Sequence, residues 1–145
     1  MDAGRTLALL VMSEERRLSL LEHLEACGIV VLAVGDCGEA RRTLQSNPQV
    51  DVILTDLALS DGNWTDLLAA AIRCHSRAET VICMGVTDSR LWIDDLEGGA
   101  YDVLVEPYQK EDVNRIVEAA VARSRIPPSS LWQNSLPCGR GSASR

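Results

Sequence analysis

The sequence contains no phenylalanine, and its aromatic residues are three tryptophans and two tyrosines. Any hydrophobic core must therefore be aliphatic, which is feasible because 46% of the residues are hydrophobic. No stretch approaches the roughly 20 apolar residues that a membrane-spanning helix needs, and the apolar run at 7–12 is too short for a signal peptide. We therefore expect a soluble, cytoplasmic protein with no membrane partner.

Lysine is also scarce, since Lys110 is the only one, and the 21 acidic residues outnumber the 14 basic residues to give a net charge of -7. The chain beyond Arg125 holds two arginines and no acids, so that residues 1–125 carry -9. A negative field of this size repels nucleic acid. The charge therefore argues against a nucleic-acid partner.

The cysteines lack the spacing of a metal site or of a disulfide framework. Their number is odd and no CxxC pair occurs, which argues against both. We expect reduced thiols, mostly buried as small apolar groups. The five are Cys27, Cys37, Cys74, Cys83 and Cys138.

Short apolar runs alternate with helical patterns along the first 125 residues. Near-continuous apolar runs are typical of strands buried on both faces of a parallel sheet. The alternation predicts an α/β domain over 1–125, a (βα)5 doubly wound parallel five-stranded sheet. The predicted strands are 6–12, 29–34, 50–55, 80–85 and 101–105. The predicted helices are 14–27, 37–46, 62–75, 88–98 and 110–123.

Residues 126–145 have a different composition, rich in proline, serine and glycine. This composition predicts a disordered tail rather than a second domain. The segment "SLWQNSL" within it is either a short docking segment or a stretch whose Trp132 and Leu136 rest loosely on the domain.

Two stretches of this pattern resemble a known family. "DVILTDLALSDGNWTDLL" and "GGAYDVLVEPY" are similar to the receiver domain of bacterial two-component response regulators, and the resemblance covers residues 5–124. It implies the flavodoxin-like receiver fold and places Asp56 at the phosphoacceptor aspartate. It also implies a phosphorelay in which a histidine kinase supplies the phosphoryl group and Mg²⁺ neutralises its charge.

The residues that would support this chemistry are replaced. The family's metal-binding acid pair falls on Val11 and Met12, and its lysine before the conserved proline falls on Glu106. Its switch hydroxyl falls on Cys83 or Met84, which a one-residue ambiguity leaves open, and its switch aromatic falls on Val103.

Weak substitutes for the acid pair follow the first strand. Ser13, Glu14 and Glu15 offer oxygens that are able to hold Mg²⁺ beside Asp56. The simpler interpretation is that Ser13 caps the first helix and that the two acids suit its positive end. We therefore expect no metal site, with Ser13, Glu14 and Asp56 as the weak candidates.

Trp64 occupies a place where the family has a glycine. The indole either covers the site or contributes to a contact surface, or it packs partly buried, and the sequence does not decide between these. Asp56 consequently stands almost alone, and we predict that its phosphorylation is absent or very slow.

Two classes of function follow. The first is a pseudo-receiver, a single-domain signalling module without catalytic activity or cofactor. It binds a signalling protein, a histidine kinase or another regulator, through a face that includes Trp92, Tyr101 and Tyr108. Homodimerisation is left open. The second is an orthodox receiver phosphorylated on Asp56 with Mg²⁺. An enzyme or nucleotide-binding domain is disfavoured, because no glycine-rich phosphate loop follows the first strand.

Overall fold

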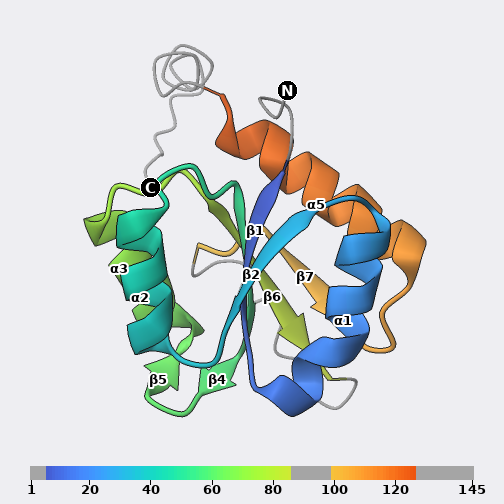
Figure 1. Ribbon diagram of the computed structural model, residues 1–145, viewed down its shortest axis with the longest axis horizontal. Helices are drawn as coiled ribbons and strands as arrows, with labels where there is room; N and C mark the ends of the chain where they lie inside the picture. Colours follow the sequence, from blue (N-terminus) through green and yellow to red (C-terminus); the bar gives the residue numbers. More distant parts are fainter. Residues whose placement is uncertain (1–5, 86–98, 127–145) are drawn as a thin grey trace.

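The computed structural model describes residues 6–85 and 99–126. Its centre is a parallel sheet of five strands in the order β2-β1-β3-β6-β7 (Figure 1). These strands are β1 Leu7–Val11, β2 Val30–Val34, β3 Val52–Asp56, β6 Glu79–Met84 and β7 Asp102–Val105. The predicted (βα)5 fold class, with its flavodoxin-like sheet, is confirmed. The helix predicted over 88–98 lies outside the described residues.

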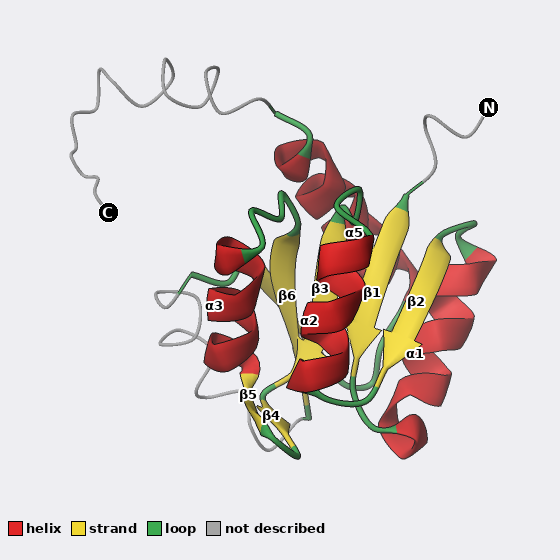
Figure 2. Ribbon diagram, turned by 60° about the vertical axis from the view of Figure 1, so that its left-hand side comes forward, coloured by secondary structure: helices red, strands yellow, loops and turns green. Residues whose placement is uncertain are grey.

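Four helices of the described part cover the two faces of the sheet (Figure 2). They are α1 Glu14–Ala26, α2 Cys37–Ser46, α3 Trp64–Arg73 and α5 Lys110–Ser124. Leucines of α1 and the apolar stripe of α5 pack on one face, whereas α2 and α3 pack on the other. Every residue of β3 is buried. This two-sided burial explains why the strands read as continuous apolar runs.

One small element escaped the sequence analysis. Strands β4, Ala58–Leu59, and β5, Gly62–Asn63, form an antiparallel hairpin directly after β3. The Asp61 carboxylate in its turn accepts hydrogen bonds from the backbone N–H groups of Cys37, at 2.8 Å, and Gly38, at 3.0 Å. The hairpin therefore caps the N-terminus of α2, where backbone donors lack partners within the helix.

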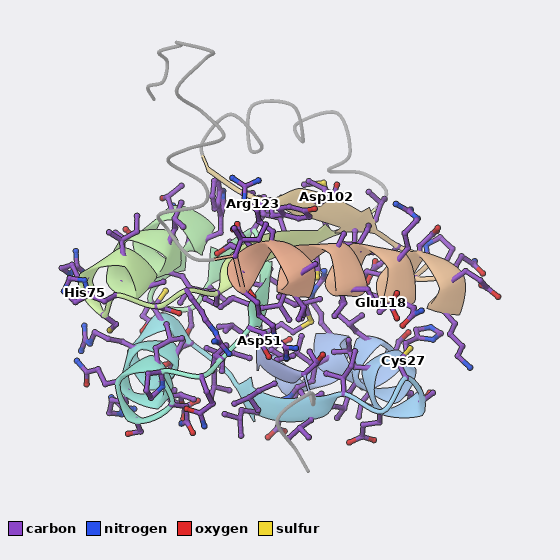
Figure 3. The ribbon with its side chains drawn as sticks, turned by 90° about the horizontal axis from the view of Figure 1, so that it is seen from above. Cys27, Asp51, His75, Asp102, Glu118 and Arg123 are labelled. Atoms are coloured by element: carbon purple, nitrogen blue, oxygen red, sulfur yellow. The ribbon has the colours of Figure 1, made fainter. Side chains whose placement is uncertain are left out.

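The opposite end of the sheet is held by a buried acid. Asp51 is 1% exposed and accepts hydrogen bonds from Arg77 at 2.8 Å and from the backbone of Leu7 at 3.1 Å. Arg125 adds two more, at 3.1 Å from Nε and 2.9 Å from an Nη nitrogen. Figure 3 shows Asp51 toward the middle of the molecule when it is viewed from this end. Asp51 thus joins the end of α5 to the starts of β1 and β3.

Candidate functional site

Asp56 is the last residue of β3, as expected, and is 7% exposed. It lies in register with Cys83 on β6. Side chains in register on neighbouring strands point to the same face, and Cys83 packs in the core cluster beneath α1 and α5. The carboxylate therefore points toward the side of the sheet that α1 covers.

The partner of this carboxylate is Arg16, in the first turn of α1. Its Nε donates to Asp56 Oδ1 at 2.8 Å, and its Nη1 lies 3.7 Å from Glu106 Oε2. Arg16 was not among the site residues predicted from the sequence. The available signal was that α1 begins immediately after β1, which places its first turn at the edge of the sheet where ligands bind in open α/β folds. The neighbouring Arg17 carried the same signal, but it pairs with Glu14 at 3.7 Å.

Burial dominates the electrostatics of Asp56. It raises the pKa of the carboxyl above its usual value, the charge and hydrogen bond of Arg16 oppose the shift, and the charge of Glu106 adds to it. Desolvation lowers the pKa of Arg16, but Asp56 outweighs that effect and the net shift is upward. One guanidinium thus serves two carboxylates, so that the cluster carries one net negative charge when all three groups are ionised.

A cavity of about 310 Å³ opens beside this cluster. Its lining consists of Arg16, Asp56, Leu57, Ala58, Cys83 and Met84. Cys83 and Met84, the two candidates for the switch hydroxyl, are 0% and 1% exposed, and the register puts Cys83 directly beside Asp56. Burial, followed by the charge of Asp56, raises the pKa of the Cys83 thiol. The thiol therefore remains protonated and supplies only a weak hydrogen-bond donor.

The oxygens around Asp56 fit Mg²⁺ poorly. Val11 and Met12, at the positions of the acid pair, are fully buried and apolar. Glu14 lies 3.7 Å from Arg17, and its side chain is 90% exposed. In residues 6–85 and 99–126 no three or more His, Cys, Asp or Glu side chains are grouped so that they could hold a metal ion. Mg²⁺ requires several oxygen ligands in octahedral geometry, and the described side chains near Asp56 do not supply them.

Ser13 occupies the N-cap position of α1 but makes no capping hydrogen bond with its side chain. The predicted side-chain cap is therefore wrong. The backbone carbonyl of Ser13 still accepts from Arg16 and Arg17 N–H, at 3.2 Å and 3.1 Å. The start of α1 thus depends on backbone bonds, together with the acids of its first turn.

The aromatic residues of the expected interaction face are distributed differently. Tyr108 is 7% exposed and packs in the core beneath α5, so its assignment to an interaction face is wrong. Tyr101 is partly buried against the same core cluster. Trp92 lies outside the described residues. Trp64 is 6% exposed and packs with Ile82, Met84 and Ala100, which settles its role as a packing residue.

Comparison with known proteins agrees with this architecture. A receiver domain from Clostridium thermocellum superposes with a TM-score of 0.71 at 23% identity, covering 81% of this chain and 95% of that domain. The chain has the receiver fold. The chemotaxis protein CheY of Thermotoga maritima is 22% identical over 105 residues, which are 71% of this chain and 83% of CheY. The sequence matches no protein-family model.

The receiver fold also occurs in proteins with other names. A Rhodopirellula baltica protein named adenylate cyclase superposes with a TM-score of 0.74 at 17% identity, covering 91% of this chain and 98% of that one. At such identities the likeness establishes a shared fold and leaves the function to the site. None of the helices in the described part of the chain is long and apolar enough to cross a membrane.

Proposed function

We propose that this protein is a receiver-like signalling module that acts through protein contacts, without catalysis and without phosphorylation of Asp56. The observation that carries this proposal is the ion pair between Arg16 and Asp56. In a phosphoryl-accepting site one carboxylate oxygen attacks phosphorus while the other faces the metal ion that neutralises the incoming charge. Here Oδ1 accepts a charge-assisted hydrogen bond of 2.8 Å, a strong type of bond.

The charge around Asp56 supports the same conclusion. An incoming phosphoryl group brings negative charge that a site must neutralise. Glu106 lies next to the same guanidinium and adds a negative charge there. The single positive charge of Arg16 is already outweighed by the two carboxylates of Asp56 and Glu106. The cluster therefore attracts a further anion only weakly.

A titration with beryllofluoride and Mg²⁺, followed by amide NMR, tests the proposal on the full chain. Beryllofluoride with Mg²⁺ mimics an aspartyl phosphate, and Asp56→Asn provides the control that cannot bind it. We expect the wild-type spectrum to stay unchanged, like that of the control. A saturable change that needs both Mg²⁺ and Asp56 would refute the proposal. A phosphorylatable receiver that responds to the same reagents is the positive control for an unchanged spectrum.

The orthodox alternative, a phosphorelay receiver modified on Asp56 by a histidine kinase, has one observation in its favour. The cavity beside Asp56 has room for a phosphoryl group, and Arg16 is a cation at its wall. In that case a small radioactive phosphodonor would label the wild type in the presence of Mg²⁺ and leave Asp56→Asn unlabelled. Absence of label in both proteins is the result that we expect.

The partner in this proposal is a signalling protein, a histidine kinase or another regulator. Of the two aromatic residues of the expected face that the structure describes, Tyr101 is the partly accessible one. A surface around β7 and α5 therefore remains the proposed contact region, with Tyr101 rather than Tyr108 as its anchor. If a Tyr101→Ala variant keeps full affinity for an identified partner, the contact surface does not include Tyr101.

A further inference from the structure

Strand β2 is an edge strand of the described part of the sheet. Among the strands that the structure describes, it stands at the end of the order, next to β1 (Figure 2). Its sequence, VVLAV, contains no charge and no proline, whereas edge strands are commonly protected by such residues. Val30 and Ala33 are exposed. The strand therefore offers an apolar edge to which another strand can add.

The hydrogen bonds to β1 identify which groups of β2 face outward. Val30 N–H donates to Thr6 at 3.0 Å, and Val34 accepts from Met12 N–H at 3.1 Å. Backbone groups of alternate residues in a strand point to opposite sides. The amides and carbonyls of Val31 and Ala33 consequently point away from β1, toward the open edge.

A groove accompanies this edge on the α2 side. Its volume is about 450 Å³. It is lined by Ala33, Val34, Glu39, Arg42, Thr43, Ser46 and Asn47. When a peptide adds to a sheet edge, main-chain hydrogen bonds supply affinity and pockets for alternate side chains supply specificity. The lining of this groove suits polar side chains.

The C-terminal segment starts within reach of this edge. Arg125 is tied to Asp51 at the start of β3, two strands from β2, a separation of about 10 Å at the usual spacing. Residues 127–131 span up to about 17 Å when extended. The C-terminal end of α5 lies at the end of the sheet where the strands begin (Figure 1). A segment that continues from there along β2 would therefore run parallel to β2.

We propose that residues 131–136, Leu-Trp-Gln-Asn-Ser-Leu, add to β2 as a sixth, parallel strand. Their alternation places Gln133 and Ser135 toward the polar groove and Trp132 toward the other face. The carboxylates of Asp36, Glu39 and Asp61 gather where β2 ends, around the start of α2. Arg140 follows the added strand by four residues, and the segment 127–145 holds no acid. Charge complementarity thus favours the same direction.

The other edge strand of the described sheet is less suited to this role. β7 begins with Asp102, and a charge on an edge disfavours further pairing. A second copy of the chain is a competing occupant of β2, but it would have no tether. The C-terminal segment is held at high effective concentration by its attachment to α5.

Amide hydrogen exchange on the full chain tests the proposal. The test variant is Gln133→Pro, which removes a donor and disfavours strand pairing, and the matched control is Ser142→Pro, outside the proposed strand. We expect the amides of Val31 and Ala33 to exchange about tenfold or more faster in Gln133→Pro than in wild type. The control and the amide of Leu9 in β1 should match the wild type.

Three results would overturn the proposal. Equal exchange of Val31 and Ala33 in both variants and the wild type would mean that residues 131–136 do not cover β2. Protection that rises with protein concentration and persists in Gln133→Pro would assign the edge to a second copy. A change confined to Val103 and Val105 would place the segment on β7 instead.

Discussion

Arg16 and Asp56, forty residues apart in the chain, form an ion pair at the carboxyl ends of β1 and β3, with Arg16 Nε 2.8 Å from Asp56 Oδ1. The arginine comes from the first turn of α1 and the aspartate from the last position of β3. The carboxylate that the resemblance assigns to phosphoryl transfer is therefore paired with a cation of the protein itself. Because Glu106 lies 3.7 Å from the same guanidinium, the pair also connects α1 to the loop between β7 and α5.

Replacing Arg16 with alanine should raise the pKa of Asp56 further. Burial already raises it, and Arg16 is the group that opposes this shift. NMR titration of the Asp56 carboxyl carbon measures the pKa directly. At about pH 7 we also expect a loss of roughly 1–2 kcal/mol of stability, since removal of one partner leaves a mostly buried carboxylate unpaired.

The matched control for this change is Arg115→Ala. Arg115 pairs with Asp112 at 3.3 Å, and both side chains are more than half exposed. An exposed pair of this kind contributes about 0–1 kcal/mol. A pKa of Asp56 that stays unchanged in Arg16→Ala would show that the ion pair does not govern the carboxyl.

The pH dependence of Asp56→Asn should reveal a charge that destabilises the fold. The folded-state pKa is raised above the ordinary 3.8, so the folded state binds this proton more tightly than the unfolded state. The penalty is absent below 3.8 and grows as pH rises through the folded pKa. Denaturant unfolding should therefore show wild type losing stability relative to Asp56→Asn across that window. A gap that moves in the opposite direction would contradict the raised pKa.

The fold was predictable because its signals are local and repeated. Helix α2 matches its predicted range, and the five strands lie within a residue or two of theirs. The β4–β5 hairpin was missed because two-residue strands leave no hydrophobic period to detect. Tyr108 was wrongly expected on the surface. It lies in the loop before α5, and the sequence of such a loop does not show whether a side chain points into the core or into solvent.

The sequence predicted which family residues the site lacks, but it did not predict that Arg16 pairs with Asp56. Val11, Met12 and Glu106 could be read as departures from the family pattern, position by position. Arg16 could not, because nothing in "SEERR" distinguishes an arginine that reaches Asp56 from one that pairs along the helix, as Arg17 does. Such pairing depends on how α1 sits on the sheet, which is a tertiary property.

Gly62→Ala should destabilise the hairpin and the start of α3. Gly62 has a φ of 157°, and an added Cβ would lie 2.6 Å from the Asp66 carboxylate. That carboxylate cannot move freely, because it accepts from Asn63 N–H within the capping box of α3. We expect a loss of about 1–3 kcal/mol in denaturant unfolding.

The control for Gly62→Ala is Gly35→Ala. Its added Cβ would lie 3.8 Å from Glu39 Oε1, an ordinary contact distance. A small effect is expected there. Equal losses for the two glycine variants would attribute the result to glycine replacement in general rather than to the contact with Asp66.

Asp51→Asn should produce the opposite pH behaviour to Asp56→Asn. Burial alone would raise the pKa of Asp51, but the hydrogen bonds from Arg125 and Leu7 and the charges of Arg125 and Arg77 outweigh it and lower the pKa below 3.8. A lowered folded-state pKa contributes stability that is fully present above 3.8 and is lost as pH falls through the folded value. At about pH 7 we expect Asp51→Asn to cost roughly 2–4 kcal/mol, because two arginines lose their shared buried partner.

Denaturant unfolding at several pH values should show the difference in stability between wild type and Asp51→Asn narrowing toward acid. The control Asp112→Asn, at an exposed pair, should stay close to wild type throughout. A gap that is equally wide in acid would mean that Asp51 stabilises the fold by shape and hydrogen bonding rather than by its charge.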